Sequence, residues 1–115
     1  MTDRLPQVLA RTPRGSDAID LELRVPAELL WLRGHFPGTP ILPGVVQVHW
    51  ALHFARECLG VALPAAKDFQ IKFKTIIVPD DRLVLALDHN SGRGHLGFEY
   101  RRGEQVCSNG RIKLS

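Results

Sequence analysis

Residues 43–60, PGVVQVHWALHFARECLG, predict the one long helix of the chain. Pro43 suits the first turn of a helix, because the N–H that proline lacks would have no partner there, and Gly60 suits the residue after the last turn. Apolar side chains cover much more than one stripe of this helix. We therefore expect a central helix that is buried on several sides, with a sheet wrapped around it.

Segments with alternating polar and apolar residues on both sides of the helix predict that sheet. Residues 18–25 alternate with the period of a strand that has one buried face. Four further strands are predicted after the helix, at residues 69–73, 83–87, 94–100 and 105–114. We expect an order of two strands, the helix and four strands, which is an α+β architecture.

Length and composition limit the protein further. A chain of 115 residues, 44% of them hydrophobic, fits a single domain over residues 1–115. A domain of this size buries only about two thirds of its unfolded surface, so a large ligand tunnel would have to lie between subunits. We therefore expect an oligomer.

Charge and segment composition predict a cytoplasmic protein. The first fifteen residues carry charges and proline where a signal peptide needs an apolar run, and no segment approaches the roughly 18 apolar residues of a membrane span. The net charge is +3, but the basic residues are scattered and predict no nucleic-acid partner. Cys58 and Cys107 lack metal-type spacing and are expected to be buried as small hydrophobic residues.

The segment 34–45, GHFPGTPILPGV, resembles the signature of the hot-dog 3-hydroxyacyl-acyl carrier protein dehydratases, and residues 69–74 and 77–83 resemble the strand and proline turn of that family. Within the family, residues 41–51, ILPGVVQVHWA, are most similar to the small ApeI-like dehydratases of aryl-polyene biosynthesis. The resemblance extends over about residues 16–114. It implies a hot-dog fold, a homodimer joined edge to edge, an acyl-pantetheine tunnel at the interface, an acyl carrier protein as partner, and no cofactor.

Dehydration of a 3-hydroxyacyl thioester needs a base for the α-proton, an acid for the departing hydroxyl and a donor for the thioester oxygen. His35 lies at the family's catalytic histidine and, with an ordinary pKa near 6.5, can act as the base. The N–H of Gly44, at the start of the helix, can donate to the enolate oxygen. The alternatives are that His35 only forms a hydrogen bond in a tight loop and that Gly44 allows the turn into the helix.

His49 departs from the family pattern. It lies fourteen residues after His35, where the dehydratases carry glutamate or aspartate. An imidazolium can also protonate a hydroxyl, but two neighbouring imidazoles depress each other's protonation. We predict His49 as the acid or as a water-positioning group that faces His35 of the other subunit, and retained, retuned or lost activity all stay open.

Other residues are assigned to binding. Phe36, Pro37, Gly38 and Val45 are predicted to contact substrate, Phe36 and Pro37 also being scaffold. Gln47 either orients a water or the thioester, or satisfies backbone groups as a buried glutamine. Five basic residues could bind the acidic surface and the phosphopantetheine of a carrier protein, and the alternative is that they are ordinary solvated charges. They are Arg33, Lys72, Lys74, Arg101 and Arg102.

Two histidine groups have simpler interpretations. His49, His53 and Glu57 have the i, i+4, i+8 spacing of a metal site but lack a fourth ligand, and we predict no metal. His89 and His95 flank a Ser-Gly-Arg-Gly turn and are predicted as solvated loop residues.

Three functions remain open. The first is a lyase that converts a 3-hydroxyacyl thioester on a carrier protein to the trans-2-enoyl thioester in fatty-acid or aryl-polyene type biosynthesis. The second is an acyl thioesterase, which the same fold also supports, although its usual carboxylate is missing at position 49. The third is a non-catalytic subunit that pairs with an active dehydratase. We favour the lyase.

Overall fold

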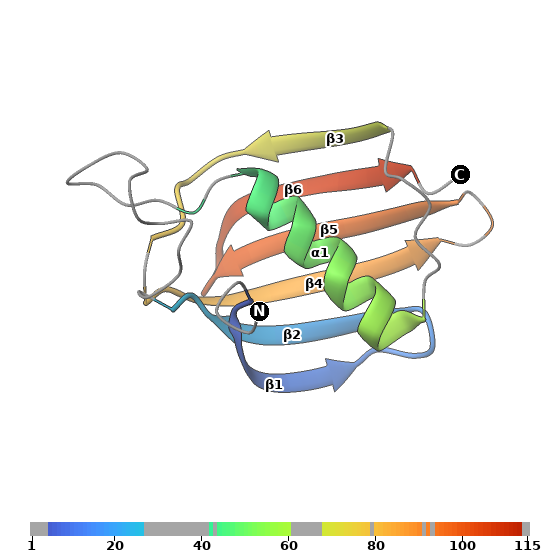
Figure 1. Ribbon diagram of the computed structural model, residues 1–115, viewed down its shortest axis with the longest axis horizontal. Coiled ribbons are helices and arrows are strands. Elements are labelled where there is room, and N and C mark those ends of the chain that lie inside the picture. Colours follow the sequence, from blue (N-terminus) through green and yellow to red (C-terminus); the bar gives the residue numbers. More distant parts are fainter. Residues whose placement is uncertain are drawn as a thin grey trace.

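In the computed structural model, the described residues form one curved antiparallel sheet and one long helix (Figure 1). The structure describes residues 5–26, 42, 44–60, 68–78, 80–90, 92 and 94–113. The elements are β1 (Gln7–Pro13), β2 (Ala18–Arg24), α1 (Gly44–Leu59), β3 (Asp68–Phe73), β4 (Arg82–Asn90), β5 (His95–Arg102) and β6 (Gln105–Lys113). The predicted α+β order of two strands, a helix and four strands is confirmed.

The strands do not lie in the sheet in the order of the chain. The spatial order is β1-β2-β4-β5-β6-β3, with every neighbouring pair antiparallel. The first strand after the helix, β3, therefore forms one edge of the sheet beside the last strand, β6. No helix among the described residues has the length and apolar character needed to cross a membrane.

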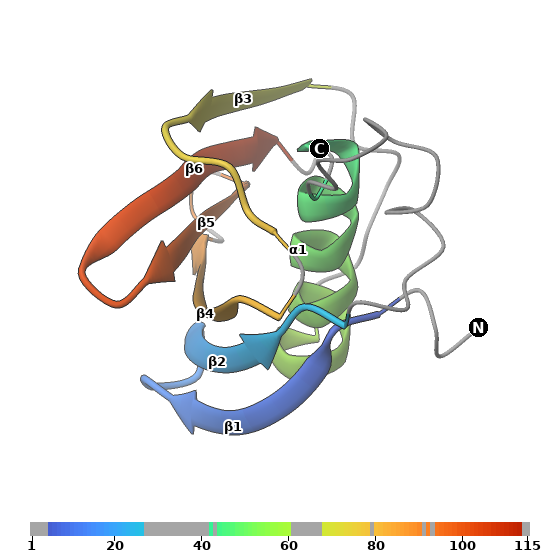
Figure 2. The ribbon, with the colours of Figure 1, turned by 90° about the vertical axis from the view of Figure 1, so that its left-hand side faces the viewer.

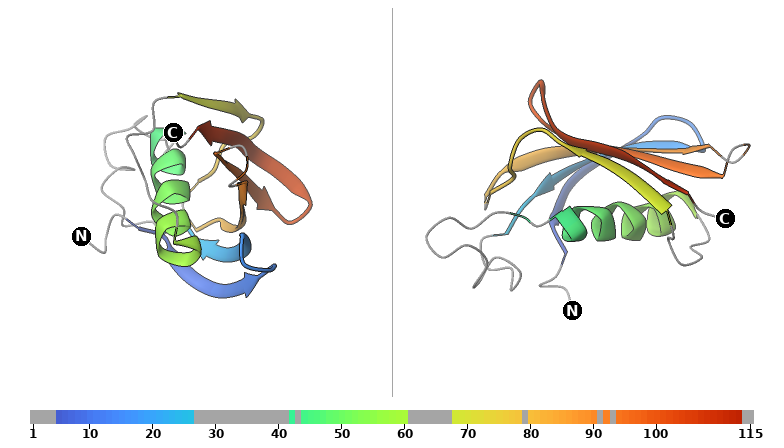
Figure 3. Two further views of the ribbon diagram at one scale, coloured as in Figure 1. Left: turned by 90° about the vertical axis from the view of Figure 1, so that its right-hand side faces the viewer. Right: turned by 90° about the horizontal axis from the view of Figure 1, so that it is seen from above.

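The core lies between α1 and the concave face of the sheet, here called the inner face (Figures 2 and 3). Leu83, Leu85 and Leu87 of β4 alternate with less buried residues, so that one side of a central strand is entirely apolar. Trp50 fills the space beneath the helix and is completely buried. This pattern explains why the period-two segments predicted strands with one buried face.

The ends of α1 agree with the sequence, and its burial does so over most of its circumference. Gly60 follows the helix with a φ of 66°, a left-handed conformation that glycine adopts without strain. The buried residues of α1, Val46, Gln47, Val48, Trp50, Ala51, Phe54 and Ala55, occupy more than half of the helix circumference, and the sheet curves around the helix (Figure 3). On another face Val45 is 76% exposed and His49 is also exposed.

Three local predictions need correction or refinement. The sequence did not locate β1, in which most residues are exposed and no apolar alternation marks a buried face. His89 and His95 are half-buried residues of β4 and β5 rather than solvated loop residues, because β4 extends three residues beyond its predicted end and His95 is the first residue of β5. Cys107 is buried as expected, whereas Cys58 is half-buried against the core.

Adjacent residues of β4 provide a test of this packing. Leu85→Ala removes a buried side chain and leaves a cavity, and should lower the free energy of unfolding by about 2–5 kcal/mol. Val84→Ala, on the less buried side of the same strand, should cost about 1 kcal/mol. Urea denaturation followed by circular dichroism measures both, and equal losses would contradict the assignment of the inner face.

Candidate functional site

The N-terminus of α1 begins at Gly44, close to the edge strand β3. The first N–H groups of an α-helix have no acceptor within the helix, and the aligned peptide dipoles place partial positive charge at this end. No acidic residue occurs in the first turn of α1. Nothing in that turn therefore opposes a developing negative charge on a ligand oxygen.

An apolar groove with a volume of about 430 Å³ opens beside this N-terminus. It is lined by Gly44, Val45, Val48, Ile71 and Phe73. These side chains lack hydrogen-bonding groups, so the groove suits a hydrocarbon chain rather than a polar ligand.

Phe73 explains why residue 44 is a glycine. A Cβ atom added to Gly44 would lie 2.5 Å from Cζ of the Phe73 ring and 3.0 Å from its Cε1. Any side chain at position 44 would thus displace the ring. The glycine allows the aromatic ring to lie directly against the start of the helix.

Phe73 also belongs to a row of three residues on the inner face, here called the rung. In the strand register Phe73 of β3 pairs with Ser108 of β6, which in turn pairs with Tyr100 of β5. The Ser108 hydroxyl donates to Oε1 of Gln47 at 2.6 Å, and the Tyr100 hydroxyl donates to the backbone oxygen of Gln47 at 2.6 Å. All three members of the rung therefore contact the first two turns of α1.

Gln47 connects the rung to the residue that precedes the helix. Its Nε2 donates to the backbone oxygen of Leu42 at 3.3 Å, and the Leu42 N–H donates to the oxygen of Ile77 at 2.7 Å. Burial raises the pKa of Tyr100 well above its ordinary value, so its hydroxyl stays protonated as a donor. Gln47 thus forms the hydrogen bonds expected of a buried glutamine that satisfies backbone groups. Its contact with substrate stays a prediction.

The other predicted site residues fall into two groups. His35, Phe36, Pro37 and Gly38 lie outside the described residues. His49 lies on the exposed face of α1, on a different side of the helix from Gln47. Gly44 and Val45 meet at the groove, and their predicted roles, like that of His49, stay predictions.

Sequence reasoning did not identify several residues of the site. Ile71 and Phe73 were assigned only to a strand, and Ser108 and Tyr100 were given no role. The alternation of β3 placed Ile71 and Phe73 on one face and so carried part of the signal. The turn at residues 101–104 indicated the pairing of β5 with β6, but the pairing of β3 with β6 had no counterpart in the sequence pattern.

The described cysteine, histidine and acidic side chains do not point to other chemistry. No three His, Cys, Asp or Glu residues in the described part of the chain are placed to hold a metal ion, so His49, His53 and Glu57 do not form such a group. Desolvation by burial raises the pKa of the Cys58 and Cys107 thiols, which disfavours the reactive thiolate.

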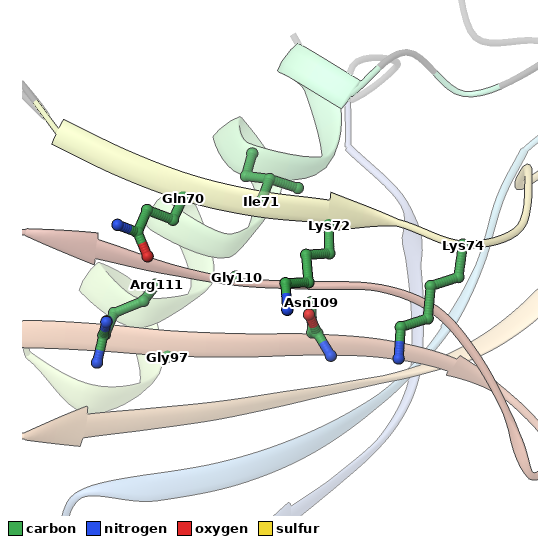
Figure 4. A pocket seen from close by; sticks show the side chains of 8 residues that line it. All are labelled: Gln70, Ile71, Lys72, Lys74, Gly97, Asn109, Gly110 and Arg111. Carbon is green, nitrogen blue, oxygen red and sulfur yellow. The ribbon is translucent and has the colours of Figure 1, made fainter.

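A second, basic groove lies on the opposite, outer face of the sheet (Figure 4). It has a volume of about 700 Å³, and its lining residues are Gln70, Ile71, Lys72, Lys74, Gly97, Asn109, Gly110 and Arg111. Figure 4 shows the long polar side chains of this set on the side of the sheet away from α1, where Gly97 leaves space between them.

The candidate carrier-binding residues separate into paired and accessible groups. Arg102 lies 2.7 Å from Asp81 and Arg101 lies 3.5 Å from Glu99, so both have acidic neighbours within the chain. Lys72 and Lys74 are exposed at the basic groove, and Arg111 joins them there although the sequence did not indicate it. Arg33 lies outside the described residues.

Comparisons with known proteins agree with this fold. An antiparallel sheet that curves around one long helix is the architecture of the hot-dog proteins. A family model described as ApeI dehydratase matches residues 11–111. The chain belongs to this ApeI-like family.

Individual relatives support the same assignment. The dehydratase heterocomplex ApeI:P from Xenorhabdus doucetiae is similar, with a TM-score of 0.88, 31% identity, and coverage of 95% of this chain and 96% of that chain. The 3-hydroxyacyl-[acyl-carrier-protein] dehydratase FabZ of Caldicellulosiruptor saccharolyticus is 30% identical over 93 residues, or 67% of this chain. The chain spans 63% of the length of that relative.

More distant structures share the fold alone. Thioesterase superfamily member 2 from Mus musculus has a TM-score of 0.66 at 13% identity, with coverage of 90% of this chain and 77% of that chain. Such a likeness confirms the α+β hot-dog fold and carries no information about the reaction.

The contact between Gly44 and Phe73 yields a prediction about stability. Gly44→Ala should lower the free energy of unfolding by no more than about 1 kcal/mol, because its methyl group displaces the tip of the Phe73 ring, which is 58% exposed and can turn toward solvent. In a Phe73→Ala background the same change should cost nothing, or gain up to about 1 kcal/mol, because alanine favours a helix. Urea denaturation of the four proteins measures the difference, and the same loss in both backgrounds would contradict the contact.

Proposed function

We propose that the chain is a 3-hydroxyacyl-acyl carrier protein dehydratase, a lyase that forms a trans-2-enoyl thioester in fatty-acid or aryl-polyene type biosynthesis. The observation that carries the proposal is the apolar groove at the N-terminus of α1, where the first turn contains no acidic residue. Membership of the ApeI-like family supports the same reaction. The protein acts in the cytoplasm.

The residues divide the reaction between them. His35 removes the α-proton of the thioester, and the N–H of Gly44 donates to the oxygen that gains charge in the enolate. The C3–O bond then breaks, a double bond forms between C2 and C3, and the hydroxyl leaves as water after protonation by His49. The acyl chain lies in the groove between Val45 and Phe73.

A homodimer completes this site. The edge strand β3 has β6 on one side and no strand of the described residues on the other. Phe73, Val45 and Ile76 are large apolar side chains that are 58%, 76% and 55% exposed. An edge strand with exposed apolar side chains favours pairing with a second chain, which would bring His49 of one subunit toward His35 of the other.

The carrier protein docks on the basic groove of the outer face. Lys72, Lys74 and Arg111 take part in none of the ion pairs found in the described part of the chain, so their charges are not neutralised there. Alternation along β3 places Lys72 and Lys74 on the outer face, whereas Phe73 between them lines the apolar groove.

A second candidate function is a partner subunit without activity of its own. The similar structure from Xenorhabdus doucetiae is a dehydratase heterocomplex, ApeI:P. His49 in this chain replaces the acidic residue expected at that position. In this alternative, the chain binds a different hot-dog subunit that supplies the missing carboxylate.

Intact mass spectrometry of a 3-hydroxyacyl carrier protein separates these functions. Incubation with the purified protein should lower the carrier mass by one water, and His35→Ala should slow this loss by about 10²-fold or more without unfolding, because the base is removed. Loss of the whole acyl group would instead indicate a thioesterase. An unchanged carrier across several chain lengths, with an intact homodimer, would support the partner-subunit function.

Charge reversal in the basic groove tests the carrier site. The combined change Lys72→Glu, Lys74→Glu and Arg111→Glu should raise KM for the acyl carrier about tenfold at low salt, because opposite charges steer and hold the two proteins. KM for a short pantetheine thioester without the carrier should not change. Arg82→Glu, a reversal elsewhere on the outer face, is the matched control, and an equal effect of that change would argue against the groove.

A further inference from the structure

Gln47 and Ser108 form a buried polar pair between α1 and the sheet. They are 4% and 0% exposed, and in the described part of the chain they are the buried residues with polar side chains that are neither aromatic nor charged. The hydrogen bond from Ser108 Oγ to Gln47 Oε1 is 2.6 Å long. A buried amide destabilises the fold unless it is hydrogen-bonded, so this pair is retained for its bonds rather than for apolar packing.

The second group of the same amide reaches the chain before the helix. Gln47 Nε2 donates to the oxygen of Leu42, which lies two residues before Gly44 and seven residues after His35. The N–H of Leu42 is held in addition by the oxygen of Ile77. Leu42 is thus fixed through both of its backbone polar groups, one of which depends on Gln47.

These hydrogen bonds are formed by residues on both sides of Gly44, whose N–H we propose as the donor to the enolate oxygen. Gly44 lies between Leu42 and Gln47, and the side-chain bond from Gln47 to Leu42 spans it. From the sheet, Tyr100 holds the backbone oxygen of Gln47. The direction of the Gly44 N–H is therefore set by contacts on both sides, and a hydrogen-bond donor must be aimed to within a few tenths of an ångström to be effective.

We propose that Gln47 and Ser108 are a positioning pair, which holds Leu42 and thereby aims the Gly44 N–H. This inference rests on the dehydratase function proposed above. It differs from the sequence-based prediction that Gln47 contacts substrate. The pair acts through Leu42 and Gly44 and touches no reacting atom.

The kinetic test separates positioning from binding. Gln47→Met and Ser108→Ala should each lower kcat for dehydration about 10–100-fold and leave KM for the acyl carrier unchanged, because the basic groove is intact. The double variant should lose no more than the more damaged single variant, since Ser108 acts on this segment only through Gln47. Additive losses, or a rise in KM with unchanged kcat, would overturn the proposal.

Gln105→Met is the matched control. It removes another glutamine–hydroxyl bond, from Gln105 Nε2 to Thr75 Oγ1 at 3.2 Å, at the exposed hairpin end of β6. Its kcat should stay within about twofold of the original protein. A loss as large as that of Gln47→Met would show that any glutamine bond in this sheet matters equally, and would also overturn the proposal.

Hydrogen exchange gives a readout that does not need activity. The amide proton of Leu42 should exchange about tenfold faster in Gln47→Met and Ser108→Ala than in Gln105→Met, while the amides of β4 keep their protection. Should Gln47→Met not fold, Ser108→Ala, which leaves the glutamine in place, carries the test alone.

The two readouts separate the two proposals. If the original protein dehydrates no carrier, the proposed function fails and exchange at Leu42 alone decides whether the pair positions this segment. Unchanged exchange at Leu42 in both variants overturns the positioning pair, whatever the activity.

Discussion

The position of the N-terminus of α1 on the sheet is the constraint on which the rest of the site depends. The rung of Phe73, Ser108 and Tyr100 joins β3 to the β5–β6 hairpin, which is distant from it in sequence, and meets the first two turns of one helix. The ring of Phe73 gives the helix one apolar contact, and the hydroxyl groups of Ser108 and Tyr100 give it two hydrogen bonds. Because an α-helix is rigid over these turns, fixing them also fixes the direction of its N–H groups.

The edge strand β3 serves two surfaces at once. Its period-two alternation sends Ile71 and Phe73 to the apolar groove on the inner face and Lys72 to the basic groove on the outer face, with Lys74 continuing the row just beyond the strand. An acyl chain is apolar and a carrier protein is acidic, but the two are covalently linked in the substrate proposed above. The strand β3 therefore presents an apolar face and a basic face at the same edge of the sheet.

Local sequence rules were sufficient for the elements with a buried face. The proline and glycine that bound α1 and the alternation in β2 to β6 are local signals, and the structure confirms these elements within a few residues. The strand β1 was not located because its side chains are mostly exposed and its pattern carries no burial signal. The apolar pattern of α1 overestimated burial along one stripe only, where Val45 is exposed.

Site residues within a local sequence motif could be predicted, whereas residues that only strand pairing brings together could not. Gly44 and Val45 follow from the motif at the helix start and meet at the groove. Ser108 is one serine among strand residues, and its bond to Gln47 depends on a pairing across 61 positions of the chain. Such long-range partners follow from the topology of the sheet rather than from any local pattern.

The central claim is that the acyl thioester lies at the N-terminus of α1. The most direct test is an NMR titration of the ¹⁵N-labelled protein with a 3-hydroxyacyl-pantetheine amide, which resembles the thioester but is chemically stable. If the thioester lies there, the amide signals of Gly44 and Val45 should shift most, and the Gly44 amide proton should move downfield because it donates to the ligand oxygen. Saturable binding that leaves these two signals unchanged and shifts others would contradict it.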